Sequence, residues 1–365
     1  MPALHVLHAR HTAGRAALAV VAVGATVAAL VLPSAAAASG PARRAASTYR
    51  VDKLVADTAA AGAKTVDAQL VNPWGLSAGP STPLWVSDNG TDVTTVYSGG
   101  SGGTAPNKVL TVGTPGGAPT GQVFNDTNTF KVGGTPATFI FAGEHGDITA
   151  WNGGANAVKK AHTKNAVYKG LALTNSPFGP LLLAANFHAG SVDVFNGSFQ
   201  RLHVPRLFDD TTIPNGFAPF NVAVFGKTVY VAYAKQDAEK TDDVPGAGNG
   251  FIDTYTTYGA FLGRFTSHGD LNSPWGMVIA PAGFGDLTGD LLVGNFGDGR
   301  IHAYDPSNAM EVGTLQKAAG KPITIDGLWG LLVGNSAAGG ANAIWFSAGP
   351  DHEAHGLLGT LTLKS

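Results

Sequence analysis

The chain has 365 residues, of which 44% are hydrophobic and 50 are glycine, and it contains no cysteine. This composition favours many short apolar strands joined by tight turns, and it excludes both a disordered chain and a disulfide-stabilised one. Only 13% of the residues are charged, the formal net charge is −2, and no basic cluster exceeds a pair such as Arg43–Arg44. Such a charge distribution argues against a nucleic-acid-binding protein.

The N-terminal segment has the order of a secretory signal peptide. Two arginines precede an uncharged apolar run over residues 16–32, and Pro33 is followed by small residues that fit an A-x-A cleavage site. A retained membrane anchor is the weaker alternative, because the run is at the short limit for spanning a bilayer. We therefore predict a signal peptide over residues 1–38, a flexible leader over residues 39–48, and a secreted protein with no stable membrane span after cleavage.

A hairpin pattern follows and recurs six times: an apolar strand, a polar turn, and an alternating strand. The apolar strands of the six copies begin at Leu84, Thr138, Leu181, Thr228, Asp290 and Ala343. No segment of this region shows helical periodicity. Six units over residues 49–363 have about 52 residues each, which is the size of a propeller blade.

A second motif precedes most of the hairpins. Residues 72–76 (NPWGL) match residues 273–277 (SPWGM), and looser copies occupy residues 219–222 and 328–331. The glycine would let backbones crowd together near an axis, while the aromatic residue would pack against the neighbouring unit. We interpret these stretches as the innermost strand of each unit.

The repeated units predict an all-β fold, a six-bladed β-propeller over residues 49–365. A β-sandwich shares the strand signals but does not explain six similar units, whereas in a propeller each small sheet buries its faces against its neighbours. The last unit has only three strands, and residues 49–55 form an unassigned strand. We expect this N-terminal strand to complete the last blade and to cover an edge that would otherwise invite aggregation.

Three motifs also carry a resemblance: residues 72–76, residues 119–125 (PTGQVFN) and above all residues 291–301 (LLVGNFGDGRI). With them, residues 49–363 resemble an uncharacterised family of exported bacterial β-propellers that is similar to the NHL-repeat proteins. The resemblance implies a propeller fold and export, and it assigns no catalytic residue. More distant propellers with known chemistry include the streptogramin lyases and gluconolactonase-like hydrolases, whose metal ligands do not map onto this sequence.

Polar residues gather in the turns between the second and third strands of the units. In a four-stranded blade these turns share a face with the start of the innermost strand, so they would surround one mouth of the central tunnel. The candidate ligand-binding residues are Asp88, Glu144, His145, His188, Asp298 and His352. Their oxygens would suit Ca²⁺ and the histidines Zn²⁺ or another transition metal. The alternative is that Asp, Asn and Gly stand there because tight hairpins require them.

In the fourth unit a charged insertion, residues 235–249, replaces the short turn. It would lie at the same mouth, either as a lid or partner contact or as a tolerated surface loop. The chain has no G-x-S-x-G motif, no Walker loop and no cysteine nucleophile. We therefore expect a binding or interaction module that presents its loop-rich face to a small molecule, a carbohydrate (glycan), a peptide or a protein. The alternatives are a metal-dependent lyase or lactone hydrolase that uses a divalent ion, and a structural envelope protein.

Overall fold

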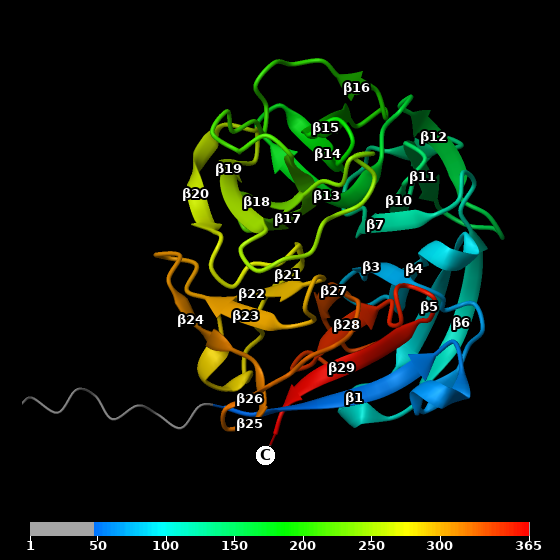
Figure 1. Cartoon of the computed structure of the whole chain (residues 1–365). Coiled ribbons are helices and arrows are strands. Elements are labelled where there is room, and N and C mark those ends of the chain that lie inside the picture. The colour runs from blue at the N-terminus through cyan, green and yellow to red at the C-terminus, as the bar shows by residue number, and fades with distance from the viewer. Residues whose placement is uncertain (1–46, 365) are drawn as a thin grey trace, which may run out of the picture. The chain divides into compact units, whose positions relative to one another are not determined.

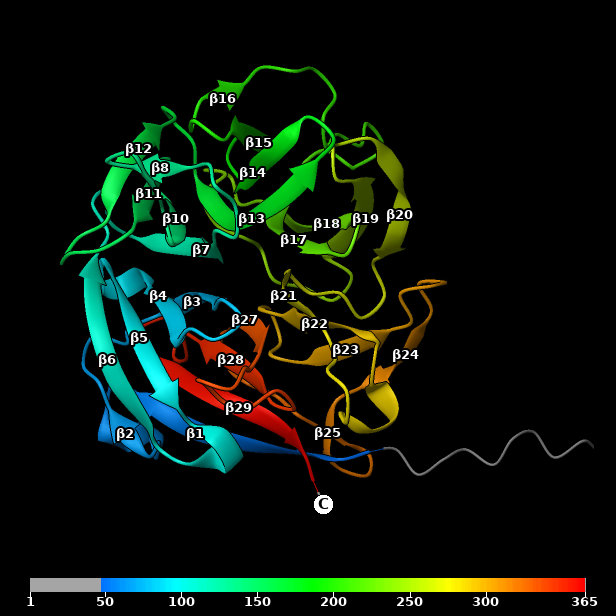
Figure 2. The ribbon, with the colours of Figure 1, turned by 180° about the vertical axis from the view of Figure 1, so that it is seen from behind.

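The computed structural model describes residues 47–364, which form six antiparallel sheets arranged around a central axis (Figures 1 and 2). The predicted six-bladed β-propeller is therefore confirmed. Within these residues the helical elements are short 3₁₀ turns, and none has the length and hydrophobicity of a membrane-spanning helix. The predicted signal peptide and most of the predicted leader lie outside the described residues.

Each blade has four principal strands, which follow one another from the axis outward. Blade 1 contains β3 (Pro73–Ser77), β4 (Leu84–Asp88), β5 (Val93–Gly99) and β6 (Pro106–Gly113). Blade 2 contains β7 (Pro119–Phe124), β10 (Phe139–Gly143), β11 (Asp147–Trp151) and β12 (Val158–His162). Blade 3 contains β13 (Tyr168–Ser176), β14 (Gly179–Asn186), β15 (Ser191–Asn196) and β16 (Arg201–Leu202).

The second half of the ring repeats this order. Blade 4 contains β17 (Phe217–Phe225), β18 (Thr228–Lys235), β19 (Gly250–Thr256) and β20 (Phe261–Ser267). Blade 5 contains β21 (Pro274–Ile279), β22 (Leu291–Asn295), β23 (Ile301–Tyr304) and β24 (Glu311–Thr314). Blade 6 contains β27 (Leu328–Val333), β28 (Ile344–Ala348), β29 (Leu357–Leu363) and β1 (Tyr49–Ala56). The second and third strands of every blade are the hairpin that the sequence predicts.

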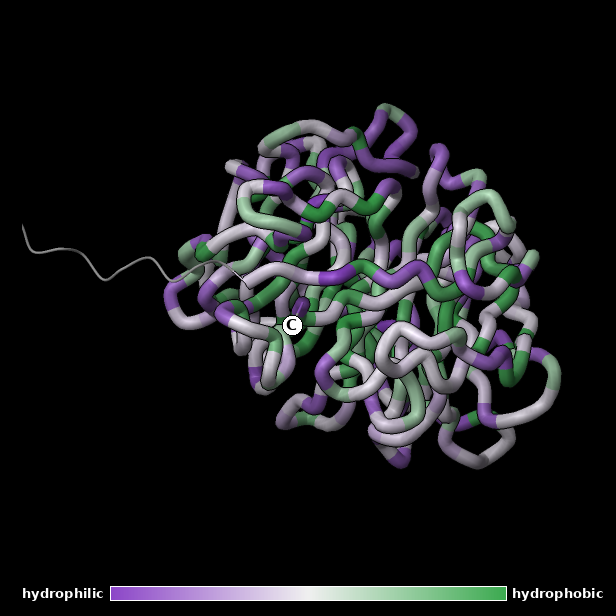
Figure 3. The backbone as a smooth tube through the Cα atoms, turned by 90° about the horizontal axis from the view of Figure 1, so that it is seen from below, coloured by the Kyte–Doolittle hydropathy of each residue, from purple (hydrophilic) through white to green (hydrophobic). Residues whose placement is uncertain are grey.

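Short elements decorate these sheets. β2 (Thr65–Val66) extends blade 6, and two small pairs are formed by β8 (Lys131–Val132) with β9 (Thr135–Pro136) and by β25 (Gln316–Ala318) with β26 (Lys321–Pro322). The 3₁₀ turns are η1 (Ala59–Ala61), η2 (Asn89–Thr91), η3 (Ser101–Gly103) and η4 (Gly285–Leu287). The apolar core lies between adjacent blades. Figure 3 shows hydrophobic stretches along the interior strands and pale or hydrophilic stretches in the outer loops.

The N-terminal strand completes the last blade, as predicted. β1 runs antiparallel to β29, from Tyr49 opposite Leu363 to Ala56 opposite Leu357 (Figure 1, blue beside red). Leu54, in the middle of this strand, is fully buried. Because the pairing joins segments from opposite ends of the described chain, it closes the ring and covers both edges.

The innermost strands approach one another so closely that glycine is required at the contact. A Cβ added at Gly75 would lie 2.3 Å from the carbonyl oxygen of Thr120 in the next blade. One added at Gly121 would lie 2.3 Å from the backbone nitrogen of Leu171 in the blade after that. Real Cβ atoms do not come this close to backbone, which confirms the prediction that glycine lets the strands crowd near the axis.

Near this contact, the pairing register of every innermost strand shifts at a β-bulge, which is followed by glycine in five blades and by Asn221 in blade 4. A bulge re-aims the side chain that it carries. We call the six residues at this point the neck residues: Trp74, Thr120, Lys169, Phe220, Trp275 and Trp329. The Trp74 and Trp329 rings stack with centroids 3.6 Å apart, and the Trp275 ring meets Trp329 at 5.6 Å. The aromatic neck residues are buried, so they close the centre of the ring at this level.

Candidate functional site

On one face of the propeller, each turn between the second and third strands is hydrogen-bonded to the residue that precedes the innermost strand. In blade 1 the Asn89 N–H donates to the Asn72 carbonyl at 3.1 Å, and in blade 5 the Phe296 N–H donates to the Ser273 carbonyl at 3.0 Å. The equivalent donors in the other blades are Glu144, Phe187, Gln236 and Gly349. The turns and the strand starts therefore share one face, as predicted, and we call it the mouth face.

Lys169 occupies a neck position at which three other blades have tryptophan. It precedes the glycine of Tyr-Lys-Gly-Leu in β13, just as Trp74 precedes the glycine of Pro-Trp-Gly-Leu in β3. The Lys169 side chain is 1% exposed, and its Nζ lies 4.9 Å from the centroid of the Trp74 ring. The face of the indole attracts the ammonium. A buried charge nevertheless needs further partners to compensate for its lost hydration.

Two carboxylates from different blades supply this compensation. Lys169 Nζ donates to Glu144 Oε1 at 2.5 Å and to Asp242 Oδ1 at 2.9 Å. Glu144 comes from the turn after β10 in blade 2, whereas Asp242 comes from the insertion in blade 4. Burial alone would lower the pKa of Lys169, but the charges of Glu144 and Asp242 outweigh it and raise that pKa. Lys169 is therefore an ammonium at neutral pH.

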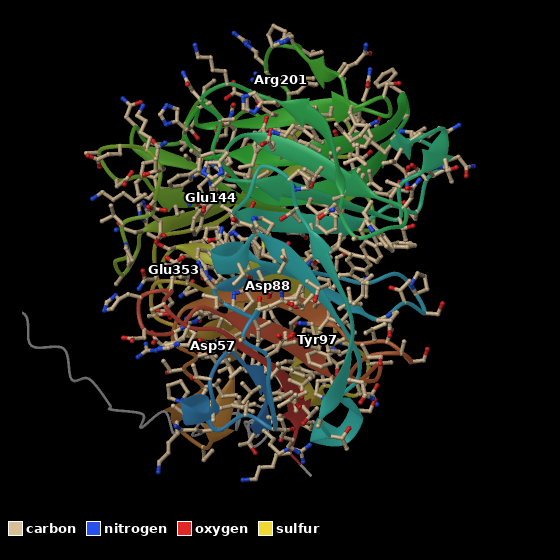
Figure 4. All side chains as sticks on the ribbon, turned by 90° about the vertical axis from the view of Figure 1, so that its right-hand side faces the viewer. Asp57, Asp88, Tyr97, Glu144, Arg201 and Glu353 are labelled. Carbon is tan, nitrogen blue, oxygen red and sulfur yellow. The ribbon has the colours of Figure 1, made fainter. Side chains whose placement is uncertain are left out.

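A chain of hydrogen bonds extends this pair to blades 1 and 6. Asn89 Nδ2 donates to Glu144 Oε2 at 3.0 Å, and Asn89 Oδ1 accepts from Asn72 Nδ2 at 3.3 Å. Asn72 Nδ2 also donates to Glu353 Oε2 at 2.6 Å, and Asn72 Oδ1 accepts from Trp329 Nε1 at 3.1 Å. In Figure 4, Glu144 and Glu353 lie near the same edge of the molecule. The network thus joins residues of five blades, all except blade 5, and it includes the neck residues Lys169 and Trp329.

The network contains more negative than positive charge. The single ammonium of Lys169 faces the carboxylates of Glu144, Asp242 and Glu353, with Asp243 next to them. Burial raises the pKa of Asp243 to about 6. Burial also raises the pKa of Glu353, and the charges of Glu144 and Asp242 add to that rise. Asp243 Oδ2 is buried and has no hydrogen-bond partner among residues 47–364. One buried carboxylate oxygen of the site is therefore left without a partner by the described protein groups.

Among the predicted acidic residues, Glu144 belongs to this network and the other two do not. Asp88 ends β4 and is fully buried inside blade 1, where burial raises the pKa of its carboxyl well above the usual range (Figure 4). Asp298 caps its own turn, because its Oδ1 accepts from the Arg300 N–H at 3.1 Å. Asp298 thus has the turn-forming role that was the alternative to ligand binding. Of the three acidic residues, Glu144 is the one that lies in the Lys169 network.

The predicted histidines lie on the mouth face without converging. The His145 side chain is exposed and its Nδ1 bonds to the Gly116 carbonyl at 2.7 Å; His188 is half-buried and His352 is exposed. Among residues 47–364, the one group of histidine and acidic side chains close enough together to hold a metal ion consists of Asp270, His302 and Glu311. None of the six predicted residues belongs to it.

Sequence reasoning missed Lys169, Asp242 and Glu353. A signal for the lysine was present, because alignment of residues 168–171 with residues 73–76 places it where the repeat has tryptophan. A charged residue at a position that is buried and aromatic in the other repeats needs oppositely charged partners, so it indicates a polar site. Asp242 lies in the charged insertion that the sequence places at the mouth, whereas no comparable signal marks Glu353.

Two relatives of the chain are uncharacterised viral proteins, while no protein-family model matches it. The uncharacterised protein R648 of Acanthamoeba polyphaga mimivirus is 33% identical over 343 residues, which are 88% of this chain and 82% of that protein. The uncharacterised mimivirus protein L690 is 34% identical over 345 residues, which are 88% of this chain and 87% of that protein. Because these relatives are viral, they leave the bacterial origin expected from the resemblance unconfirmed.

Two solved structures share the fold. A streptogramin B lyase aligns with a TM-score of 0.50 and 10% identity over 87% of this chain and 97% of its own. The virginiamycin B lyase of Staphylococcus aureus aligns with a TM-score of 0.50 and 13% identity over 87% of this chain and 100% of its own. Likeness at such identities concerns the propeller fold alone.

Proposed function

This chain belongs to the family of the mimivirus proteins R648 and L690, and we propose that it is a binding protein whose mouth face holds a small polar ligand at the Lys169 network. The observation that carries the proposal is the buried ammonium of Lys169 among carboxylates that come from three other blades. The fold does not need a lysine there, since three other blades fill the neck with tryptophan. Lys169 and its carboxylate partners therefore bring charge to a position that tryptophan fills elsewhere, and we attribute this charge to a role in recognition.

The network also defines the chemistry of the ligand. Carboxylate and amide oxygens accept hydrogen bonds, and the surplus negative charge favours a ligand that carries hydroxyl or ammonium donors. The ammonium of Lys169 has three N–H donors, of which Glu144 and Asp242 take two. The Trp74 ring covers a further side of this ammonium, which is 1% exposed, so a ligand would meet the carboxylates of the site rather than Lys169 itself. An amino sugar meets all of these requirements, so we propose a carbohydrate with an amine as the ligand class.

Binding of glucosamine, measured by isothermal titration calorimetry, tests this proposal. Glu353→Gln removes one negative charge and keeps the shape of the side chain, so we expect it to weaken binding about tenfold, in line with the loss of one charge-assisted hydrogen bond. Asp298→Asn is the matched control, because that carboxylate caps its own turn. Equal affinity in the wild type and in Glu353→Gln, or no binding by the wild type, would refute the proposal.

Elemental analysis separates this function from the alternative of a metal-dependent lyase or lactone hydrolase. We expect purified protein to hold no stoichiometric divalent ion on the mouth face. A bound ion that is lost in His188→Ala would contradict the proposal and favour the enzyme, since His188 is one of the predicted metal ligands. Glucosamine binding that survives in His188→Ala would support the carbohydrate site.

We also propose that the protein is exported. The support is the sequence of residues 1–38, with its charged start, apolar run and A-x-A site, and the absence of cysteine from the chain is compatible with any compartment. We expect the mature protein outside the expressing cell, beginning just after residue 37 or 38. N-terminal sequencing of the secreted protein checks this, and an intracellular protein that keeps residues 1–38 would refute it.

A further inference from the structure

A separate cavity lies on the other side of the neck from the Lys169 network. It is a channel of about 410 Å³ lined by all six innermost strands, from Gly75 in blade 1 to Leu332 in blade 6. Its lining includes Trp275, one of the neck residues, so the aromatic neck forms its inner end. The channel is therefore blind and opens where the innermost strands end, which we call the exit face.

The walls of this channel are mostly apolar. Leucine, valine and methionine side chains from the innermost strands line it, and the amide nitrogens of its two buried amide side chains donate to backbone carbonyls, while Gln122 Oε1 has no partner among the described residues. Gln122 Nε2 donates to the Gly75 carbonyl at 2.6 Å, and Asn221 Nδ2 donates to the Trp275 carbonyl at 2.6 Å. A concave, largely apolar cavity of this size is typical of a small-molecule site.

The channel continues outward as a groove between blades 3 and 4. This second cavity has a volume of about 810 Å³ and shares Asp126, Leu173 and Val224 with the channel. Near the groove, Phe178 at the tip of the β13–β14 hairpin is 87% exposed, and Tyr258 is 42% exposed. Their rings meet edge to face with centroids 6.5 Å apart. Such an exposed aromatic pair beside a cavity marks an interaction site, because burial in the monomer does not explain it.

We propose that the channel and this groove form one binding site for an elongated, mostly apolar small molecule without net charge. The apolar walls favour an aliphatic or aromatic end group in the channel, and the continuity of the two cavities favours an elongated shape. The charged residues that line the groove are Asp126 and Lys227, whose charges cancel, and this favours a ligand without net charge. The Phe178–Tyr258 pair stacks on the outer part of the ligand.

The site is independent of the mouth-face site, because the packed aromatic neck separates the two. The ligand chemistry also differs, since the mouth face offers surplus carboxylates and the channel offers apolar walls. Failure of one proposal would therefore leave the other standing. Glu353→Gln, which weakens a mouth-face ligand, should leave binding at the exit face unchanged.

Nile red, an uncharged and elongated apolar dye, is the probe for this site. We expect saturable binding by the intact protein with one dye per chain, followed by dye fluorescence. Ala223→Trp places a large side chain in the channel wall and should abolish this binding. Phe178→Ala should weaken it about fivefold through the lost stacking contact, with an unchanged melting temperature because Phe178 is exposed.

Met310→Ala is the matched control, since Met310 is also exposed, at 66%, but lies between β23 and β24 of blade 5, whereas Phe178 follows Pro177 of the groove and contacts the groove residue Tyr258. The proposal is overturned if the wild type shows no saturable binding, or if Phe178→Ala binds as tightly as Met310→Ala. It is also overturned if a folded Ala223→Trp protein binds the dye as the wild type does. If Ala223→Trp does not fold, the dye affinity of Phe178→Ala relative to Met310→Ala still tests the proposal.

Discussion

Replacing Lys169 by methionine removes the buried ammonium and keeps an unbranched apolar chain over the Trp74 ring. Glu144 and Asp242 then lose their cation, and removing one partner of a buried ion pair costs roughly 3–5 kcal/mol. The two carboxylates are 25% and 70% exposed, so water can solvate them after the substitution. We therefore expect Lys169→Met to lower the free energy of unfolding by about 2 kcal/mol, below the usual range for buried pairs.

A double-mutant cycle isolates the part of this loss that belongs to the contact with Glu144. In the wild-type background, Glu144→Gln leaves the Lys169 ammonium with one carboxylate partner fewer and should destabilise the protein. In the Lys169→Met background, the same substitution removes a carboxylate that has no cation to pair with, so its effect should be smaller. We expect an interaction energy of about 1–2 kcal/mol at pH 7, measured by urea unfolding with tryptophan fluorescence. Additive single effects, within about 0.5 kcal/mol, would refute the conclusion that the buried lysine is held by this pair.

Three further predictions concern the ring and the acidic cluster. Gly121→Ala should cost more than about 3 kcal/mol or prevent folding, because its Cβ would meet backbone, whereas Gly313→Ala, with open space around it, should be nearly neutral in the same urea assay. The pKa of Asp243 rises from 3.8 to about 6 on folding, so binding of its proton stabilises the folded protein. This stabilisation is full below pH 3.8 and is lost as the pH rises through 6, where the buried carboxyl becomes charged. Asp243→Asn, which stays neutral, should therefore increase the free energy of unfolding more at pH 8 than at pH 4, by at most about 3 kcal/mol. A chain that begins at Asp57 lacks β1 and should fail to give a monodisperse folded protein, whereas a chain that begins at Ser47 should remain monomeric and folded by size-exclusion chromatography.

The blades could be predicted because each one repeats the same local physics. Alternating strands, turn residues and the Pro-Trp-Gly motif specify a four-stranded sheet without reference to distant residues. Closure by residues 49–55 was also predictable, since a three-stranded last unit leaves an edge that the chain must cover. The strands, the turns and the closure follow from the periodicity of the sequence alone, without knowledge of individual side-chain contacts.

The site was harder to predict, because its side chains are directed by backbone irregularities. A bulge adds one residue to a strand and turns a side chain out of the alternating pattern, so sequence alternation does not indicate where Lys169 points. In the turns, one position contacts the neighbouring blade, as Asn89 does with Glu144, while positions further along face solvent or cap the turn. A shift of one or two residues therefore separates His145 and Asp298 from the network.

The bulged position connects the fold to both proposed sites. Because every innermost strand bulges next to the axis, each blade contributes one side chain at the level of the neck, and the identity of these residues decides what the centre of the ring can do. Trp74, Trp275 and Trp329 fill the space and divide the axis into a mouth-face site and a channel. Lys169 brings one charge into the same layer, and its counter-ions come from loops, which tolerate change of length and sequence more readily than strands do. A propeller can thus acquire recognition chemistry at its mouth by substitution at one neck position while the six sheets that stabilise it stay as they are.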